Sequence, residues 1–210
     1  MGRVALIDCG SGNLYAVQRA LEKVASGAHI FQCFETETLK RADKVVLTGT
    51  GNLAPYLEEL HRLDLVERLR EVAGSKPVLA SNLGLLALQD CCAGNGDTRG
   101  LGILNGAVTS NGVIEQSPQT IKPHTGWNTL HQEVRHDLWD GIPQESYFYF
   151  AHSHYVAPGE GDTVFATTEH GKKFASVIGS ENIFGVQFLP ENSQRVGLRL
   201  LANFVNWEIE

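Results

Sequence analysis

The stretch Val78-Leu79-Ala80-Ser81-Asn82-Leu83-Gly84 decides the fold. An apolar run typical of a short buried strand, Pro77–Ala80, leads directly into a helical pattern, so a sharp turn at Asn82 is expected between them. A turn of this kind lifts the residue at its apex above a sheet, at the N-terminus of a helix. Asn tolerates a positive φ better than most residues, and Gly84 suits the crowding. The stretch therefore predicts a nucleophile-elbow turn whose apex, Asn82, is not a nucleophile.

Strands and helices alternate on both sides of this turn. The expected strands of the first half are Val4–Ile7, His29–Phe34, Lys44–Leu47 and Pro77–Ala80, and the expected helices are Leu14–Val24, Pro55–Val72 and Leu83–Cys91. Strands alternating with helices predict an α/β fold with a doubly wound, mostly parallel sheet flanked by helices. In such a sheet the functional site lies at the carboxyl ends of the strands.

The second half of the chain is richer in Gly, Thr and aromatic residues, which favours a mixed extension of the sheet. The expected strands are Ala107–Thr109, Tyr147–Phe150, Val164–Thr168, Ala175–Ile178 and Ile183–Phe188, and a closing helix is expected at Val196–Trp207. No repeat, linker or low-complexity segment interrupts the sequence. We therefore expect one domain spanning residues 1–210.

Composition excludes several functional classes. The net charge is −7, and the longest basic run is Lys172-Lys173, so a nucleic-acid surface is not expected. No apolar run reaches the length of a membrane span, and no signal-peptide pattern precedes Asp8, which makes the cytosol the expected compartment. The cysteines form no Cys-x-x-Cys pair and no zinc spacing, so neither a metal nor a cofactor is expected.

Two glycine-rich turns and one hydroxyl are weak candidates on their own. Thr48-Gly49-Thr50-Gly51 follows an expected strand and could present backbone N–H groups to an oxyanion. Gly10-Ser11-Gly12-Asn13 lacks the third glycine of a dinucleotide fingerprint. Ser81 precedes the apex of the elbow and is interpreted as a turn hydroxyl.

Five longer strings carry a family resemblance. They are residues Ile7–Leu14, Pro123–Asn128, Tyr149–Tyr155, Phe184–Glu191 and Gly197–Phe204. Together they resemble the class I, triad-type glutamine amidotransferases. Within that family they are similar to the subunits that supply ammonia to the cyclase of imidazole glycerol phosphate synthase in histidine biosynthesis. The strings occur in the family's order over essentially the whole chain, so the resemblance implies a class I glutamine amidotransferase-like fold.

The resemblance also implies where the catalytic positions lie. The family's nucleophilic Cys aligns with Asn82, its general-base His with Leu189, and its orienting carboxylate with Glu191, so only Glu191 is retained. Because glutamine hydrolysis needs a thiolate and a base, the chain is expected to be hydrolytically inactive. The implied oxyanion and glutamine-pocket positions are Gly49, Thr50, Gly51, Leu83, Leu86, Ser153 and His154, with Leu86 in place of the family's Gln.

Other thiols and imidazoles are not expected to replace the lost groups. Cys91 and Cys92 are expected on the helix after Asn82, about 14 Å from it at 1.5 Å per residue. His152 or His154 could lie near enough to replace the missing base, but there is no thiol for them to activate.

The resemblance further implies a partner. The positions that match the family's surface toward the cyclase and its ammonia passage are Asn13, Trp127, Asn128, Tyr149, His152 and Asn192. Trp and Tyr are frequent anchors of specific interfaces. A heterodimer with a (β/α)8-barrel cyclase subunit is therefore expected. Two alternatives remain open: a free-standing binding or regulatory protein, and a family enzyme altered by laboratory substitution.

Overall fold

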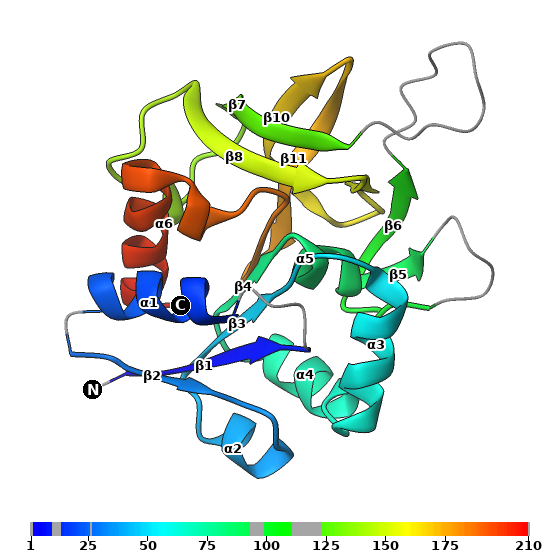
Figure 1. Cartoon of the computed structure of the whole chain (residues 1–210), viewed down its shortest axis with the longest axis vertical. Coiled ribbons are helices and arrows are strands. Elements are labelled where there is room, and N and C mark those ends of the chain that lie inside the picture. The colour runs from blue at the N-terminus through cyan, green and yellow to red at the C-terminus, as the bar shows by residue number, and fades with distance from the viewer. Residues whose placement is uncertain (1, 10–13, 26, 93–98, 111–122, 210) are drawn as a thin grey trace.

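The computed structural model describes residues 2–9, 14–25, 27–92, 99–110 and 123–209 (Figure 1). The helices are α1 (Leu14–Val24), α2 (Thr36–Lys40), α3 (Leu53–Arg62), α4 (Val66–Ala73), α5 (Leu83–Ala87) and α6 (Gln194–Asn206), with short 3-10 turns η1 (Asp137–Trp139) and η2 (Pro190–Asn192). The strands are β1 (Arg3–Asp8), β2 (His29–Gln32), β3 (Lys44–Thr48), β4 (Val78–Ser81), β5 (Gln89–Cys92), β6 (Leu104–Ser110), β7 (His124–Gln132), β8 (Ser146–His152), β9 (His154–Ala157), β10 (Thr163–His170), β11 (Lys172–Ser180) and β12 (Ile183–Val186).

One mixed sheet organises these strands. Its main path runs β2-β1-β3-β4-β12-β11-β10-β7-β8. The strands from β2 to β12 along this path pair in parallel, and those from β12 to β8 pair antiparallel. A side branch of β5, β6 and β9 joins the path where β9 pairs with β11. The predicted mixed α/β sheet flanked by helices is confirmed.

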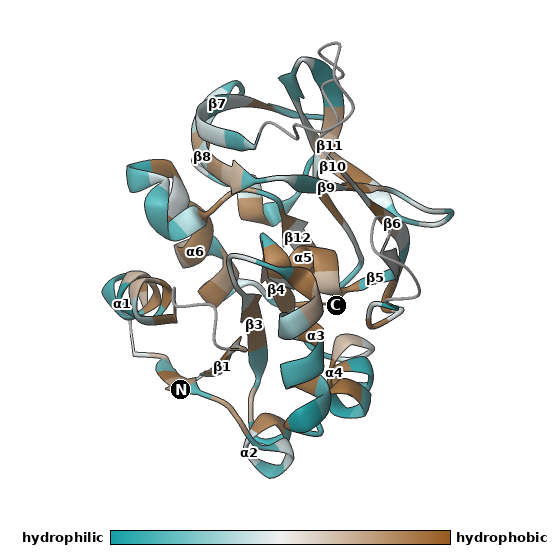
Figure 2. Ribbon diagram, turned by 45° about the vertical axis from the view of Figure 1, so that its right-hand side comes forward, coloured by the Kyte–Doolittle hydropathy of each residue, from teal (hydrophilic) through white to brown (hydrophobic). Residues whose placement is uncertain are grey.

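Each face of the sheet carries its own apolar core. On one face α1 and α6 pack together, with Leu21, Leu200 and Phe204 fully buried. On the other face α3, α4 and α5 cover the parallel strands, with Leu60 and Leu85 fully buried. Figure 1 shows α1 and α6 on one side and α3 and α4 on the other, and Figure 2 shows β3, β4 and α5 as a hydrophobic centre. The parallel strands, β4 among them, are therefore covered by helices on both faces.

The single helix predicted over Pro55–Val72 is wrong, because the structure breaks it into α3 and α4. Asp64, between the two helices, has a φ of 54°, and its amide donates to the carbonyl of His61. The apolar residues of this segment recur every third position, whereas an α-helix repeats every 3.6 residues. A continuous helix would rotate the apolar positions off the buried face, and the break at Asp64 restores the alignment.

The helix predicted over Leu83–Cys91 is also wrong in its second half, because α5 ends at Ala87 and the chain continues as β5. The last helical carbonyls are taken by a returning segment: Ala87 O accepts from Leu101 N at 2.7 Å, and Leu88 O accepts from Ile103 N at 2.9 Å. Cys91 and Cys92 are therefore strand residues opposite Ala107 and Val108 of β6. The helical spacing assumed for them does not apply.

Candidate functional site

The turn at Asn82 has the predicted elbow geometry. Asn82 links β4 to α5 with φ 49° and ψ −110°, a positive φ outside the left-handed helical region that few side-chain-bearing residues adopt. The backbone N–H of Asn82 donates to Val186 O of β12 at 2.9 Å. The backbone N–H of Leu83 donates to the carbonyl oxygen of Gly49, just after β3, at 3.1 Å. The two strands that flank β4 thus hold the turn.

Close approach of α5 to β3 makes this elbow possible. A Cβ atom on Gly84 would lie 2.1 Å from the carbonyl oxygen of Leu47, so only glycine fits there. Ser81 does not face the site, because its hydroxyl donates to Thr48 Oγ1 at 2.8 Å and is buried. Ser81 was expected to be a turn hydroxyl, but it is the last residue of β4 and its hydroxyl joins β4 to the neighbouring strand β3. Tyr56 in turn donates its hydroxyl to the carbonyl of Thr48 at 2.9 Å.

The side chains at the elbow are closed to solvent. Asn82, Leu83, Leu86 and Leu189 are each only 3% exposed. The Asn82 amide nitrogen, Nδ2, donates to the carbonyl oxygen of Ala151 in β8 at 2.9 Å. The place where the family resemblance implies a thiol therefore holds an amide that already has a partner on β8.

Leu189 lies in the loop between β12 and η2 and is joined to β8. Its amide donates to Tyr149 O at 2.9 Å, and its carbonyl accepts from Ser193 Oγ at 2.7 Å. Glu191 follows in η2 and is half-buried, while Asn192 is exposed and donates its amide to Leu189 O at 3.1 Å. The structure thus brings the three predicted triad positions to one end of the sheet, with only one ionisable side chain among them.

The remaining predicted pocket positions flank this place without supplying a nucleophile. Gly49 is buried, Thr50 is half-buried, and Gly51 has a φ of 109°, which suits glycine. Ser153 and His154 lie at the junction of β8 and β9 and are half-buried. The roles of these positions stay predictions.

A chain of imidazoles lies beside the elbow, across β7 and β8. His152 Nδ1 donates to the carbonyl of His154 at 2.9 Å, so in the neutral ring Nε2 carries the lone pair. His124 Nδ1 lies 3.1 Å from that Nε2 and must therefore be the donor. His124 Nε2 is then the acceptor for Asn128 Nδ2, at 3.1 Å. The tautomers are fixed by their partners, and no lone pair is left for a further proton.

The orientation of Asn128 is fixed as well, because its Nδ2 also donates to Glu169 O and its Oδ1 accepts from Thr129 N, both at 2.8 Å. Burial, and secondarily the neighbouring His170, lowers the pKa of His124 to about 4. Burial, and secondarily His124, lowers the pKa of His152 to about 3. His152 is therefore neutral at ordinary pH, with its basic nitrogen occupied by His124.

An aromatic pair stands on the surface formed by β7 and β8. Trp127 and Tyr149 are direct cross-strand partners with ring centroids 5.7 Å apart. Trp127 is 45% exposed and Tyr147 is 60% exposed, although both are large apolar side chains. The predicted interface positions Trp127, Asn128, Tyr149 and His152 thus share one two-stranded unit. Asn13 lies outside the described residues.

Sequence reasoning missed three participants of this site. The carbonyl of Ala151 carries no signature in the sequence. His124 stands inside one of the strings that mark the family resemblance, but nothing there indicated a pairing with His152. His170 stacks on His124 with ring centroids 4.0 Å apart, and its position at the end of β10 gave no signal.

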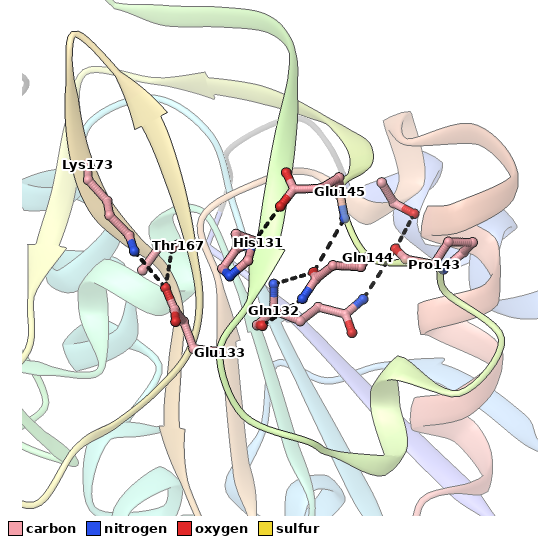
Figure 3. Close-up of polar contacts among 9 residues, drawn as sticks. His131, Gln132, Glu133, Pro143, Gln144, Glu145, Thr167 and Lys173 are labelled. Atoms are coloured by element: carbon pink, nitrogen blue, oxygen red, sulfur yellow. Dashed lines mark hydrogen bonds and ion pairs between the residues drawn. The ribbon is translucent and has the colours of Figure 1, made fainter.

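A separate polar hollow of about 320 Å³ lies on the outer part of β7, β10 and β11, lined by Thr129, His131, Glu145, Thr167, Thr168, Glu169 and Lys173. Figure 3 shows the adjoining contacts, in which Glu133 accepts from Thr167 and Lys173, and His131 meets Glu145. None of the predicted site residues lines it. Among the described residues no group of His, Cys, Asp or Glu could hold a metal ion.

Comparison with known proteins defines the class. The fold matches a crystal structure of a glutamine amidotransferase with a TM-score of 0.74 at 17% identity, covering 97% of this chain and 99% of that one. It also matches a glutamine amidotransferase from Thermotoga maritima with a TM-score of 0.60 at 18% identity, covering 94% of this chain and 80% of that one. A family model described as glutamine amidotransferase class-I matches residues 5–207, so the chain belongs to that family.

Similar proteins of known name identify the part of the family to which the chain is most similar. The imidazole glycerol phosphate synthase subunit HisH of Nitrosococcus oceani is 41% identical, over 99% of this chain and 98% of the relative. The corresponding HisH protein of Acinetobacter baylyi is 39% identical over the full length of both chains. Within its family the chain is accordingly HisH-like. In the described part of the chain no helix is long and apolar enough to cross a membrane.

Proposed function

We propose that this chain is a non-hydrolytic, HisH-like component of imidazole glycerol phosphate synthase in histidine biosynthesis, and that it forms a heterodimer with the (β/α)8-barrel cyclase. The similarity to HisH proteins over the whole chain supports the assignment to this synthase. We further propose that residues 1–210 form a single domain that works in the cytoplasm without a metal or cofactor.

The contact between Asn82 Nδ2 and Ala151 O carries the proposal that glutamine is not hydrolysed. Hydrolysis by this family's chemistry requires a thiolate at the elbow and a base beside it. Here Asn82 and Leu189 occupy those positions, and both are buried. Losing two members of a triad costs on the order of 10⁴–10⁶ in turnover. His152 cannot act as the base, because its lone pair accepts from His124.

Assembly with a cyclase is supported by the surface of β7 and β8. The exposed Trp127 pairs with the half-buried Tyr149, and aromatic residues of this kind anchor specific interfaces. The hydrogen bond between His124 and His152 joins the same two strands. Since no ammonia is made at the elbow, the benefit to the partner is its stabilisation or the gating of external ammonium.

Two measurements test the proposal. Glutamate release is measured with and without the cyclase and its ligand, with Acinetobacter baylyi HisH and its own cyclase as the positive control. We expect no release above buffer, and release at the control's rate contradicts the proposed loss of hydrolysis. Binding is measured by calorimetry against a cyclase from the same source. We expect a 1:1 complex, and no binding at tens of micromolar favours a free-standing binding protein instead.

A further inference from the structure

β8 is the last strand of the main sheet path, and within the described residues β7 is the only strand that pairs with it. Alternate residues of a strand direct their backbone groups to the same edge. Tyr149 and Ala151 therefore both address the edge opposite β7. There Tyr149 N donates to Ser193 Oγ at 3.0 Å, Tyr149 O accepts from Leu189 N at 2.9 Å, and Ala151 O accepts from Asn82 Nδ2 at 2.9 Å. The second edge of β8 is thus held by loops and side chains rather than by a strand.

Of these contacts, the one from Asn82 reaches furthest across the fold. Four strands, β12, β11, β10 and β7, separate β4 from β8 along the sheet. No ladder of sheet hydrogen bonds can therefore set the distance between the elbow and β8. The loop after β12 reaches β8 through the backbone bond from Leu189 N to Tyr149 O, and Asn82 is the elbow residue whose own side chain bonds to β8.

We infer that Asn82 is a positioning residue, a latch that ties the elbow to β8 and so fixes the strand that carries Tyr149 and His152. The residue at this position must accept the strained backbone that β12 and Gly49 hold in place, and the side-chain amide of Asn82 is long enough to donate to Ala151 O. A thiol is only a weak donor and would leave that carbonyl without an equivalent partner.

The latch has a consequence for the surface above it. Tyr149 stands two residues before Ala151 and is the cross-strand partner of Trp127, while His152 follows directly and bonds to His124 of β7. The β7–β8 ladder sets the register of the aromatic pair and the imidazole chain, and holding Ala151 fixes where this two-stranded unit lies relative to the elbow. This consequence for assembly rests on the proposed function, whereas the latch itself does not.

Hydrogen exchange of the isolated chain tests the latch. Asn82→Gly removes the amide and keeps a residue that accepts the positive φ, and Asn82→Asp keeps the shape but removes the donor. The matched control is Ser81→Ala, which removes the neighbouring buried hydrogen bond, to Thr48 rather than to β8. We expect exchange at 146–152 to rise about five- to tenfold in both Asn82 variants and to stay unchanged in the control. Unchanged exchange of β8 in Asn82→Gly, or an equal rise in the control, overturns the inference.

Protonation provides a rescue that a merely structural role would not show. Burial raises the pKa of the carboxyl introduced by Asn82→Asp, so on lowering the pH from 7 to 5 we expect it to take up a proton and donate again to Ala151 O. His124 and His152 stay neutral in this range, since their pKa values are about 4 and 3. Measured relative to the unmodified chain at each pH, protection of β8 should recover in Asn82→Asp and not in Asn82→Gly. Identical behaviour of the two variants counts against the latch.

A binding arm separates this inference from the proposed function. If the unmodified chain binds a cyclase from the same source, Asn82→Gly should weaken the complex about fivefold, and Ser81→Ala should leave its affinity unchanged. If the unmodified chain and Asn82→Gly bind the cyclase with equal affinity, the proposed effect of the latch on assembly is refuted. A chain that does not bind refutes the proposed function, while the exchange result still decides the latch.

Discussion

Reinstating the family's catalytic residues is predicted to destabilise this chain. In Asn82→Cys the bond to Ala151 O is lost, because a thiol is only a weak donor. A buried hydrogen bond to a backbone carbonyl contributes about 1 kcal/mol net, and leaving its acceptor without a partner adds about as much. The first substitution alone should therefore cost roughly 1–2 kcal/mol.

Leu189→His removes an apolar side chain that is 3% exposed and places an imidazole in the same space. Burial of a leucine contributes about 1.5–3 kcal/mol, and burying a polar ring without a partner costs about 1–3 kcal/mol. The double variant should then lose about 4–8 kcal/mol, a large part of a typical stability of about 5–15 kcal/mol. At about 2–4 °C per kcal/mol for a chain of this size, its midpoint should fall by roughly 10–30 °C.

Thermal and urea unfolding of the double variant measure this loss, and Leu189→Met serves as the control because it preserves apolar volume. The control should stay within about 1.5 kcal/mol of the unmodified chain. A double variant that melts at the same temperature or higher would refute the argument, since it would mean that Asn82 and Leu189 add no stability to the closed elbow.

Three further outcomes are expected. Because the pKa values of His124 and His152 are lowered from about 6.5, the unfolded chain binds more protons below pH 6.5. The free energy of unfolding, measured in urea titrations, should therefore decrease as the pH is lowered from about 6.5 to 4, and this dependence on pH should be shallower in His124→Phe. Trp127→Ala should weaken cyclase binding by about 2 kcal/mol or more in calorimetry, and an unaltered affinity would remove Trp127 as an anchor. Gly84→Ala should yield a strongly destabilised chain by circular dichroism, since its Cβ would meet Leu47 O at 2.1 Å.

Local pattern predicted the parallel half of the fold well, because each strand there is a short apolar run and each crossover is a helix. It failed where tertiary contacts decide the backbone. The break at Asp64 depends on keeping apolar residues against the sheet, and the end of α5 depends on Leu101 and Ile103 returning to its carbonyls. The short elements α2, β5 and β9 and the nine-residue strand β7 were not predicted, and each of these strands depends on pairing with distant strands.

The candidate site was predictable to the same extent. The turn at Asn82 follows from seven consecutive residues, and the structure has it where expected. The bond to Ala151 O could not be predicted, because a backbone carbonyl looks the same in every residue and β8 reaches the elbow only when the whole sheet has formed. The pairing of His124 with His152 likewise depends on the β7–β8 register, which places the two residues opposite each other.

The strained backbone of the turn at Asn82 indicates that this turn keeps a structural role. A positive φ costs free energy in most residues, and a strained turn persists only when its surroundings hold it. Here β12 and β3 hold the turn through Asn82 N and Leu83 N, so the strain stays in the fold although the thiol is absent. With φ 49° and ψ −110°, Asn82 lies outside the left-handed helical region in which Asn is enriched, so these two backbone bonds hold the conformation rather than a preference of the residue. Its amide also joins the elbow to the strand that bears Tyr149. The apex of the turn thus combines a strained backbone held by its neighbours with the donor that β8 needs, and this combination ties the altered site to the surface proposed to meet the cyclase.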